Sequence, residues 1–112
     1  MKGYQELNNV RVSNALGVLQ QDWSDWLEGY WWVRRVVIRV EANRPFDIFI
    51  QRRSSDGAVG AEILANSVAE VPAVGERSET DFEITGAMSF RVGVKNNGGS
   101  AGSFKVSLIL AD

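Results

Sequence analysis

The chain has 112 residues, of which 45% are hydrophobic and 23% charged, and its formal net charge is −2. This length matches one domain around a single core, and the composition lies far from that of disordered proteins. Twelve basic and fourteen acidic residues provide no strong positive field, so nucleic acid and membranes are not expected partners. The N-terminus lacks the apolar region of a secretory signal, and no run is long enough to span a membrane. We therefore expect a soluble domain made without a signal peptide.

Residues 1–14 contain few large apolar side chains. Burying them cannot offset the cost of ordering the backbone, about 1–2 kcal/mol per residue. We therefore expect an N-terminal arm over residues 1–14, separate from a domain over residues 15–112. The arm would be extended against a neighbouring subunit and mobile in an isolated monomer, with contacts from Tyr4, Leu7 and Val10.

All four tryptophans lie in the segment QDWSDWLEGYWWVRRVV, residues 21–37. A partial helical spacing from Leu19 to Leu27 allows at most one helical turn there. Four indoles carry roughly 600–1,000 Å² of surface, more than the largest exposed apolar patch of a typical monomer, about 300–600 Å². Trp32 shares the parity of the following strand and is assigned to the core. The remaining three are then available to a ligand or a partner: Trp23, Trp26 and Trp31.

The segments VVIRVE and FDIFIQR alternate apolar and polar residues, and ANRP between them predicts a β-hairpin. The loop SSDGAVGAE then predicts a hairpin from FDIFIQR to a weaker strand in AEILANS. Another strand begins in DFEITG. Two more alternating runs flank NNGGSAG, the strongest hairpin signal in the chain. Their predicted core side chains are Met88, Phe90, Val92, Val94, Phe104, Val106, Leu108 and Leu110.

Six to eight short strands, Gly-rich turns and the absence of βαβ alternation predict an all-β fold. We expect a single antiparallel β-sandwich of Ig-like or jelly-roll type. Val37, Phe49 and Ile109 have the outward parity on their strands, which predicts hydrophobic surface spread over a face. The arginines on or beside the first hairpin are expected to form ion pairs or an oligomer interface.

The chain contains neither Cys nor His. Disulfides, thiolate nucleophiles, zinc-thiolate sites and imidazole bases are therefore excluded. Asp22 and Asp25 are assigned to turn chemistry. An acidic run lacks the spacing of a calcium loop and is interpreted as solvent-exposed: Glu76, Glu79, Asp81 and Glu83. We expect no enzymatic activity, no cofactor and no metal ion.

Two functions remain for the surplus aromatic surface. Indole faces can stack on sugar rings, as in carbohydrate-binding β-sandwiches, or they can be anchors that are buried against another subunit. The outward hydrophobic residues and the polar N-terminal stretch favour a subunit that packs against copies of itself or a larger assembly. The candidate interface residues are Trp23, Trp26, Trp31, Tyr30, Phe49, Tyr4, Leu7 and Val10.

The pattern FDIFIQRRSSDG, followed by FRVGVKNNGGSAGSFKVSLIL, resembles the small cysteine-free β-sandwich proteins that decorate or cement tailed-bacteriophage capsids. The resemblance covers residues 46–110 and leaves out the tryptophan-rich segment. It implies a non-enzymatic virion protein, often trimeric, that binds the major capsid protein from outside. A tail or fibre component and a carbohydrate-binding module are the alternative functions.

Overall fold

The computed structural model describes residues 3–84 and 89–112. These residues form antiparallel strands and contain no helix, so none that could cross a membrane. The bounds of the strands are β1 Tyr4–Leu16, β2 Gln21–Trp23, β3 Leu27–Glu28, β4 Arg35–Ala42, β5 Phe46–Arg53, β6 Ile63–Val68, β7 Ser78–Glu83, β8 Ser89–Asn96 and β9 Gly102–Ala111. Two short strands, β2 and β3, lie where the sequence pattern predicts at most one helical turn.

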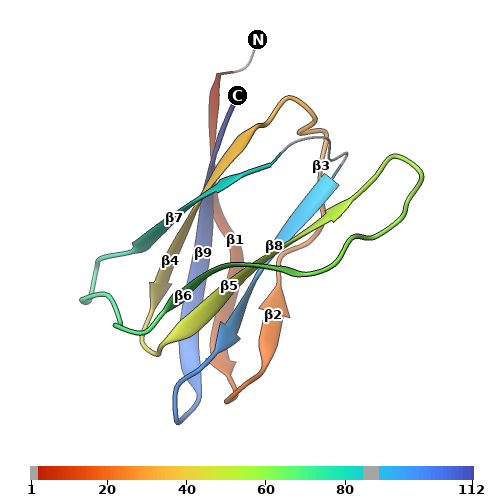
Figure 1. The fold of residues 1–112 in the computed structure, drawn as a ribbon. Helices are drawn as coiled ribbons and strands as arrows, with labels where there is room; N and C mark the ends of the chain where they lie inside the picture. The colour runs from red at the N-terminus through yellow and green to blue at the C-terminus, as the bar shows by residue number, and fades with distance from the viewer. Residues whose placement is uncertain (1–2, 85–88) are drawn as a thin grey trace.

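The strands form two sheets that pack face to face (Figure 1), so the predicted β-sandwich is confirmed. Sheet A has the order β1-β9-β4-β7, and sheet B has the order β2-β8-β5-β6, with the short β3 pairing with β8. This is the strand order of a jelly roll, the second of the two predicted sandwich types. Most connections therefore carry the chain from one sheet to the other.

Two of the three predicted hairpins are wrong. β4 pairs with β7 and β9 in sheet A, whereas β5 pairs with β6 and β8 in sheet B. Likewise β8 and β9 belong to different sheets. The connections at residues 43–45 and 97–101 do reverse the chain, but each carries it from one sheet to the other. Only the loop over residues 54–62 joins hydrogen-bonded neighbours, β5 and β6, as predicted.

The core lies between the sheets and is built from the inward parity of each long strand. Phe46 of sheet B and Phe104 of sheet A meet edge to face, with ring centroids 5.9 Å apart. Trp32 is half-buried at the margin of this core, and Met88 lies outside the described residues. The other predicted core residues are confirmed as buried: Phe90, Val92, Val94, Phe104, Val106, Leu108 and Leu110.

The N-terminal stretch is an edge strand of its own chain. β1 pairs with β9 from Tyr4 opposite Ala111 to Leu16 opposite Gly102, with two register shifts. Leu7 and Val10 pack against the core. The expectation that this stretch needs a neighbouring subunit for its order is therefore wrong, because β9 of the same chain pairs with one side of it. β1 also runs through the predicted boundary at residue 14.

Candidate functional site

A stack of aromatic and guanidinium groups covers part of the outer face of sheet B. The Arg91 guanidinium carbon lies 4.4 Å from the Trp23 ring centroid and 4.9 Å from that of Trp26. The Arg53 guanidinium carbon lies 4.6 Å from the Trp26 ring centroid. The two indoles and two guanidinium groups form a cation–π ladder, hereafter the Trp–Arg ladder (Trp23, Arg91, Trp26 and Arg53).

Strand register sets the order of this ladder. Trp23 is opposite Gly93 of β8, Arg91 is opposite Gln51 of β5, and Arg53 is opposite Ser89. A Cβ atom on Gly93 would lie 2.7 Å from the Trp23 ring, so glycine allows the indole to lie across β8. Phe49 borders Trp23, with ring centroids 6.5 Å apart.

Hydrogen bonds hold both guanidinium groups in place. Arg91 donates from Nε and Nη2 to Gln51 Oε1, at 2.9 and 2.7 Å. Gln51 in turn donates from Nε2 to the carbonyl oxygen of Gly60, at 2.9 Å. Arg53 donates to Ser89 Oγ at 3.0 Å and forms an ion pair with Glu28. Each guanidinium group of the ladder therefore has polar partners as well as indole neighbours.

Trp23 and Trp26 are committed to contacts within the chain. Both side chains are half-buried, and the Trp26 ring contacts the guanidinium groups of both Arg91 and Arg53. Guanidinium groups thus occupy faces that a sugar ring would need for stacking. The predicted ligand or partner contacts of these two tryptophans must then compete with the ladder.

Asp22, next to Trp23, links the edges of the two sheets. Its carboxylate accepts hydrogen bonds from Arg11 Nε at 2.8 Å, from the Ser13 hydroxyl, and from the Trp23 N–H at 3.0 Å. Partial burial by itself would raise the pKa of Asp22, but these hydrogen bonds and the Arg11 charge outweigh it and lower the pKa. Asp22 therefore forms an ion pair between β1 and β2, a role that the predicted turn chemistry did not include.

Trp31 differs from the other tryptophans because it points into solvent. The Val33 N–H donates to the Tyr30 carbonyl at 3.0 Å and closes a turn with Trp31 and Trp32 at its centre. Tyr30 packs edge-on against Trp32 and Phe90, so it belongs to the core margin. Trp31 remains 73% exposed.

The Trp31 turn lies at the end of the sandwich that carries both termini (Figure 1). Tyr4, 60% exposed, begins β1 at this end and is opposite Ala111. The Arg34 N–H bonds to the Ala111 carbonyl at 2.9 Å. A polar cavity of about 550 Å³ opens here, lined by Arg34, Arg35, Asp81, Glu83 and Asp112. We call this region, Trp31, Tyr4, Arg34 and Arg35, the terminal end.

The predicted outward hydrophobic residues do not share one face. Val37 and Ile109 are neighbours on the outer face of sheet A, whereas Phe49 lies on the outer face of sheet B. All three are half-buried. The expectation of a single hydrophobic face is wrong, because equal outward parity in different sheets leads to opposite sides of the sandwich.

Charges dominate the outer face of sheet A. Arg35 pairs with Asp81, and Arg39 Nε lies 2.8 Å from Glu79 Oε2. The predicted ion-pair role of these arginines is confirmed. The acidic residues on β7 thus face arginines of β4, rather than lying in a solvated loop.

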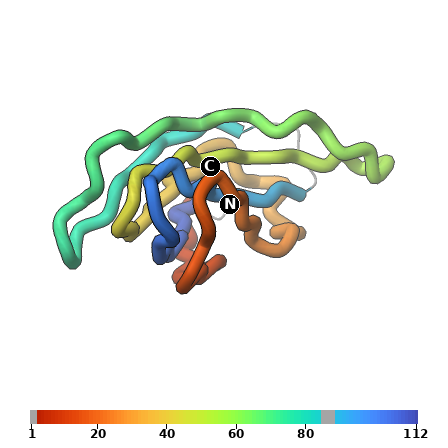
Figure 2. The backbone as a smooth tube through the Cα atoms, turned by 90° about the horizontal axis from the view of Figure 1, so that it is seen from below, coloured from red at the N-terminus to blue at the C-terminus, as the bar shows by residue number. Residues whose placement is uncertain are grey.

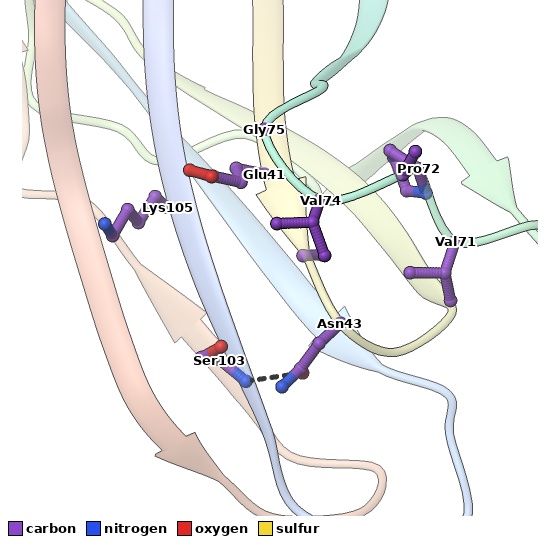
Figure 3. A pocket seen from close by; sticks show the side chains of 10 residues that line it. Glu41, Asn43, Val71, Pro72, Val74, Gly75, Ser103 and Lys105 are labelled. Atoms are coloured by element: carbon purple, nitrogen blue, oxygen red, sulfur yellow. Dashed lines mark hydrogen bonds between the residues drawn. The ribbon is translucent and has the colours of Figure 1, made fainter.

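A groove of about 280 Å³ lies between sheet A and the β6–β7 connection (Figure 3). Glu41 and Lys105, cross-strand neighbours, form one side. The other side is apolar, with Val71, Pro72 and Val74. Such a shallow, mixed lining is typical of protein contact surfaces rather than of enclosed small-molecule sites. No group of three or more potential metal ligands occurs among residues 3–84 and 89–112.

Sequence reasoning missed Arg91 and Gln51. Both have the outward parity on strands whose inward side chains form the core. The W-x-x-W spacing of Trp23 and Trp26, together with outward arginines on later strands, was the available signal. The strand order that brings them together was not visible in the sequence.

No family model and no curated protein matches the chain. Solved structures do resemble it. A chain of the infectious bursal disease virus Gt strain structure has a TM-score of 0.61 at 7% identity, covering 96% of this chain and 32% of that chain. The SPBc2 prophage-derived protein YomS has a TM-score of 0.55 at 13% identity, covering 97% of this chain and 93% of that chain. The CBM22-1 xylan-binding domain of Paenibacillus barcinonensis Xyn10C has a TM-score of 0.52 at 11% identity, covering 100% and 88%.

This chain thus spans about a third of the viral chain and most of the other two. At these identities the likeness establishes a shared fold. Proteins of viral origin and a carbohydrate-binding module both use that fold, so fold alone leaves both predicted functions open.

Proposed function

We propose that this chain is a non-enzymatic structural protein of a virion, a decoration or cement subunit at the capsid surface. It binds the major capsid protein or other virion subunits through protein–protein contacts. The observation that carries the proposal is the terminal end, where Trp31 is 73% exposed in a turn next to Arg34 and Arg35.

Physical chemistry favours this end as an interface. Tryptophan and arginine are the residue types most enriched among those that dominate binding energy. An exposed indole has apolar surface to bury. Because a hydrogen bond already closes the turn, binding loses less conformational entropy there. The chain leading to this turn is tied to the Trp–Arg ladder, because Glu28, the last residue of β3, pairs with Arg53.

The fold is also found in proteins of viral origin, which supports the proposal. A chain of a virus structure and a prophage-derived protein are similar in fold to this chain, and the prophage-derived protein is of nearly the same length. The resemblance of residues 46–110 to capsid decoration proteins points the same way.

Binding to particles tests the proposal. Virus particles that lack this protein would be incubated with the purified chain. The fraction of the chain that binds would then be measured by sedimentation. We expect Trp31→Ala to remain folded and to weaken binding about thirtyfold, which corresponds to a hot-spot loss of about 2 kcal/mol. Val18→Ala, an exposed apolar residue in the β1–β2 turn, is the matched control and should bind normally. Unchanged binding by Trp31→Ala would contradict the proposal.

Carbohydrate binding is the second candidate. It is supported by the likeness to a xylan-binding domain and by Trp31, the tryptophan with an exposed side chain. A glycan array separates the two functions: glycan binding by the wild-type chain that Trp31→Ala abolishes, without any binding to particles, would favour the carbohydrate function.

A further inference from the structure

Strand β6, Ile63–Val68, forms an open edge of sheet B. It pairs with β5 and ends the strand order of that sheet. Figure 2 shows the segment around β6, in green, as the outermost run of the chain along one side of the molecule. Among the described residues, the backbone hydrogen bonds outside the strand ladders involve none of the β6 residues. The Ser67 N–H donates to the side-chain oxygen of its neighbour Asn66 at 2.9 Å. The other backbone groups on the free side of β6 are available for pairing.

The other edge strands carry features that oppose strand pairing. β7 presents three acidic side chains, and β1 contains charged residues and two register shifts. β2 and β3 have only three and two residues. Charges, bulges and short length are the usual means by which proteins protect a sheet edge.

β6 has less of this protection. Its sequence, ILANSV, contains no charged residue and no proline, and its single irregularity lies opposite Ile48 and Phe49. Leu64 is 52% exposed on this strand. An uncharged six-residue edge of this kind is a template for adding another strand.

We propose that β6 pairs antiparallel with β6 of a second copy of this chain, so that sheet B continues across a twofold axis. In such a contact each edge faces the same edge of its partner, and any charge near the axis would meet its own copy. The absence of charge within β6 thus suits self-pairing in particular. The two exposed Leu64 side chains would approach one another across the axis and bury apolar surface.

This inference does not rest on the proposed virion function, because β6 is not part of the terminal end. The mass of the full chain in solution tests it, by light scattering during size-exclusion chromatography. We expect about twice the monomer mass of 12.4 kDa at high concentration, with dissociation on dilution. Leu64→Lys would place like charges across the axis, and it should shift the midpoint of dissociation at least tenfold toward the monomer.

Val12→Lys is the matched control, since Val12 is an exposed apolar residue of β1, another edge strand. It should leave the dimer intact. Hydrogen exchange supplies the location: amides of residues 63–68 should exchange more slowly in the dimer than in the diluted monomer. A monomeric wild-type chain at all concentrations, a trimer, or a dimer that Leu64→Lys does not weaken would overturn the proposal. Particle binding by a strictly monomeric chain would leave the virion function standing without this interface.

Discussion

The outer faces of the two sheets use arginine in different ways. On sheet A, Arg35 and Arg39 pair with carboxylates of the neighbouring strand at the surface. On sheet B, Arg91 and Arg53 pack against indoles, and Arg91 is also fixed by Gln51. On the first face arginine acts mainly as a charge, which a lysine can replace. On the second it acts as a flat group that fills space between rings, which a lysine cannot do.

A substitution in the core between the two sheets should have the largest effect on stability. Phe104→Ala empties a fully buried site against Phe46 and should lower the free energy of unfolding by about 3–5 kcal/mol. Urea unfolding followed by far-UV circular dichroism measures it. Lys105→Ala, one residue along β9 and exposed, should change little. A loss below about 1 kcal/mol for Phe104→Ala would contradict the core assignment.

Arg91→Lys tests the sheet B face directly. Lysine keeps the positive charge but cannot lie flat between Trp23 and Trp26 while donating twice to Gln51. We expect the free energy of unfolding to fall by about 1–2 kcal/mol, the size of one or two partly desolvated cation–π contacts. Tryptophan fluorescence should change as well, since both rings lose a neighbour. If Arg91→Lys is as stable as the wild type, the ladder is a charge arrangement like that of sheet A.

Asp22→Asn tests a charge that lies between the two cases, since it is partly buried and links β1 to β2. Because the folded-state pKa of Asp22 is lowered, its stabilisation is present above the unfolded value, about 3.9, and is lost as the pH falls through the folded pKa. The variant should be less stable by about 1 kcal/mol at pH 7. The difference should vanish in acid, as urea titrations from pH 7 to pH 2 would reveal. A difference that stays constant over this range would contradict the role of the charge.

Arg39→Lys on sheet A should have the smallest effect. The pair with Glu79 is at the surface, where lysine supplies the same charge and salt screens the interaction. We expect a stability equal to that of the wild type in 1 M salt and close to it in dilute buffer. An effect as large as that of Arg91→Lys would remove the contrast between the two faces.

Local patterns in the sequence predict which side chains face the core, but not which strands are neighbours. The alternation around Phe90 and Phe104 correctly predicted burial, because a half-buried strand must alternate. The glycines between these strands predicted a hairpin, although the chain there crosses between sheets. A tight reversal needs the same residue types in either case, so turn chemistry does not distinguish a hairpin from a crossing.

The Trp–Arg ladder lay beyond sequence reasoning for the same cause. Trp23 and Arg91 are 68 positions apart, and only the pairing of β2 with β8 brings them together. Strand parity did separate Trp31 from Trp32, and the structure agrees, since Trp31 is 73% exposed whereas Trp32 packs against the core. The N-terminal stretch was misjudged because its pairing with β9, nearly a hundred residues later, could not be seen in its own few apolar side chains.

The strand order also determines how the chain reaches this structure. Among the described strands, β5 and β6 are the one pair of sequence neighbours joined in a ladder, and β1 must wait for β9. A fold dominated by such distant pairings loses much loop entropy before it gains contacts, and small proteins of this kind refold in milliseconds to seconds. During synthesis β1 leaves the ribosome first and its partner β9 last of the strands. The nascent chain therefore carries β1 without its partner until β9 has emerged, and over that interval aggregation competes with folding.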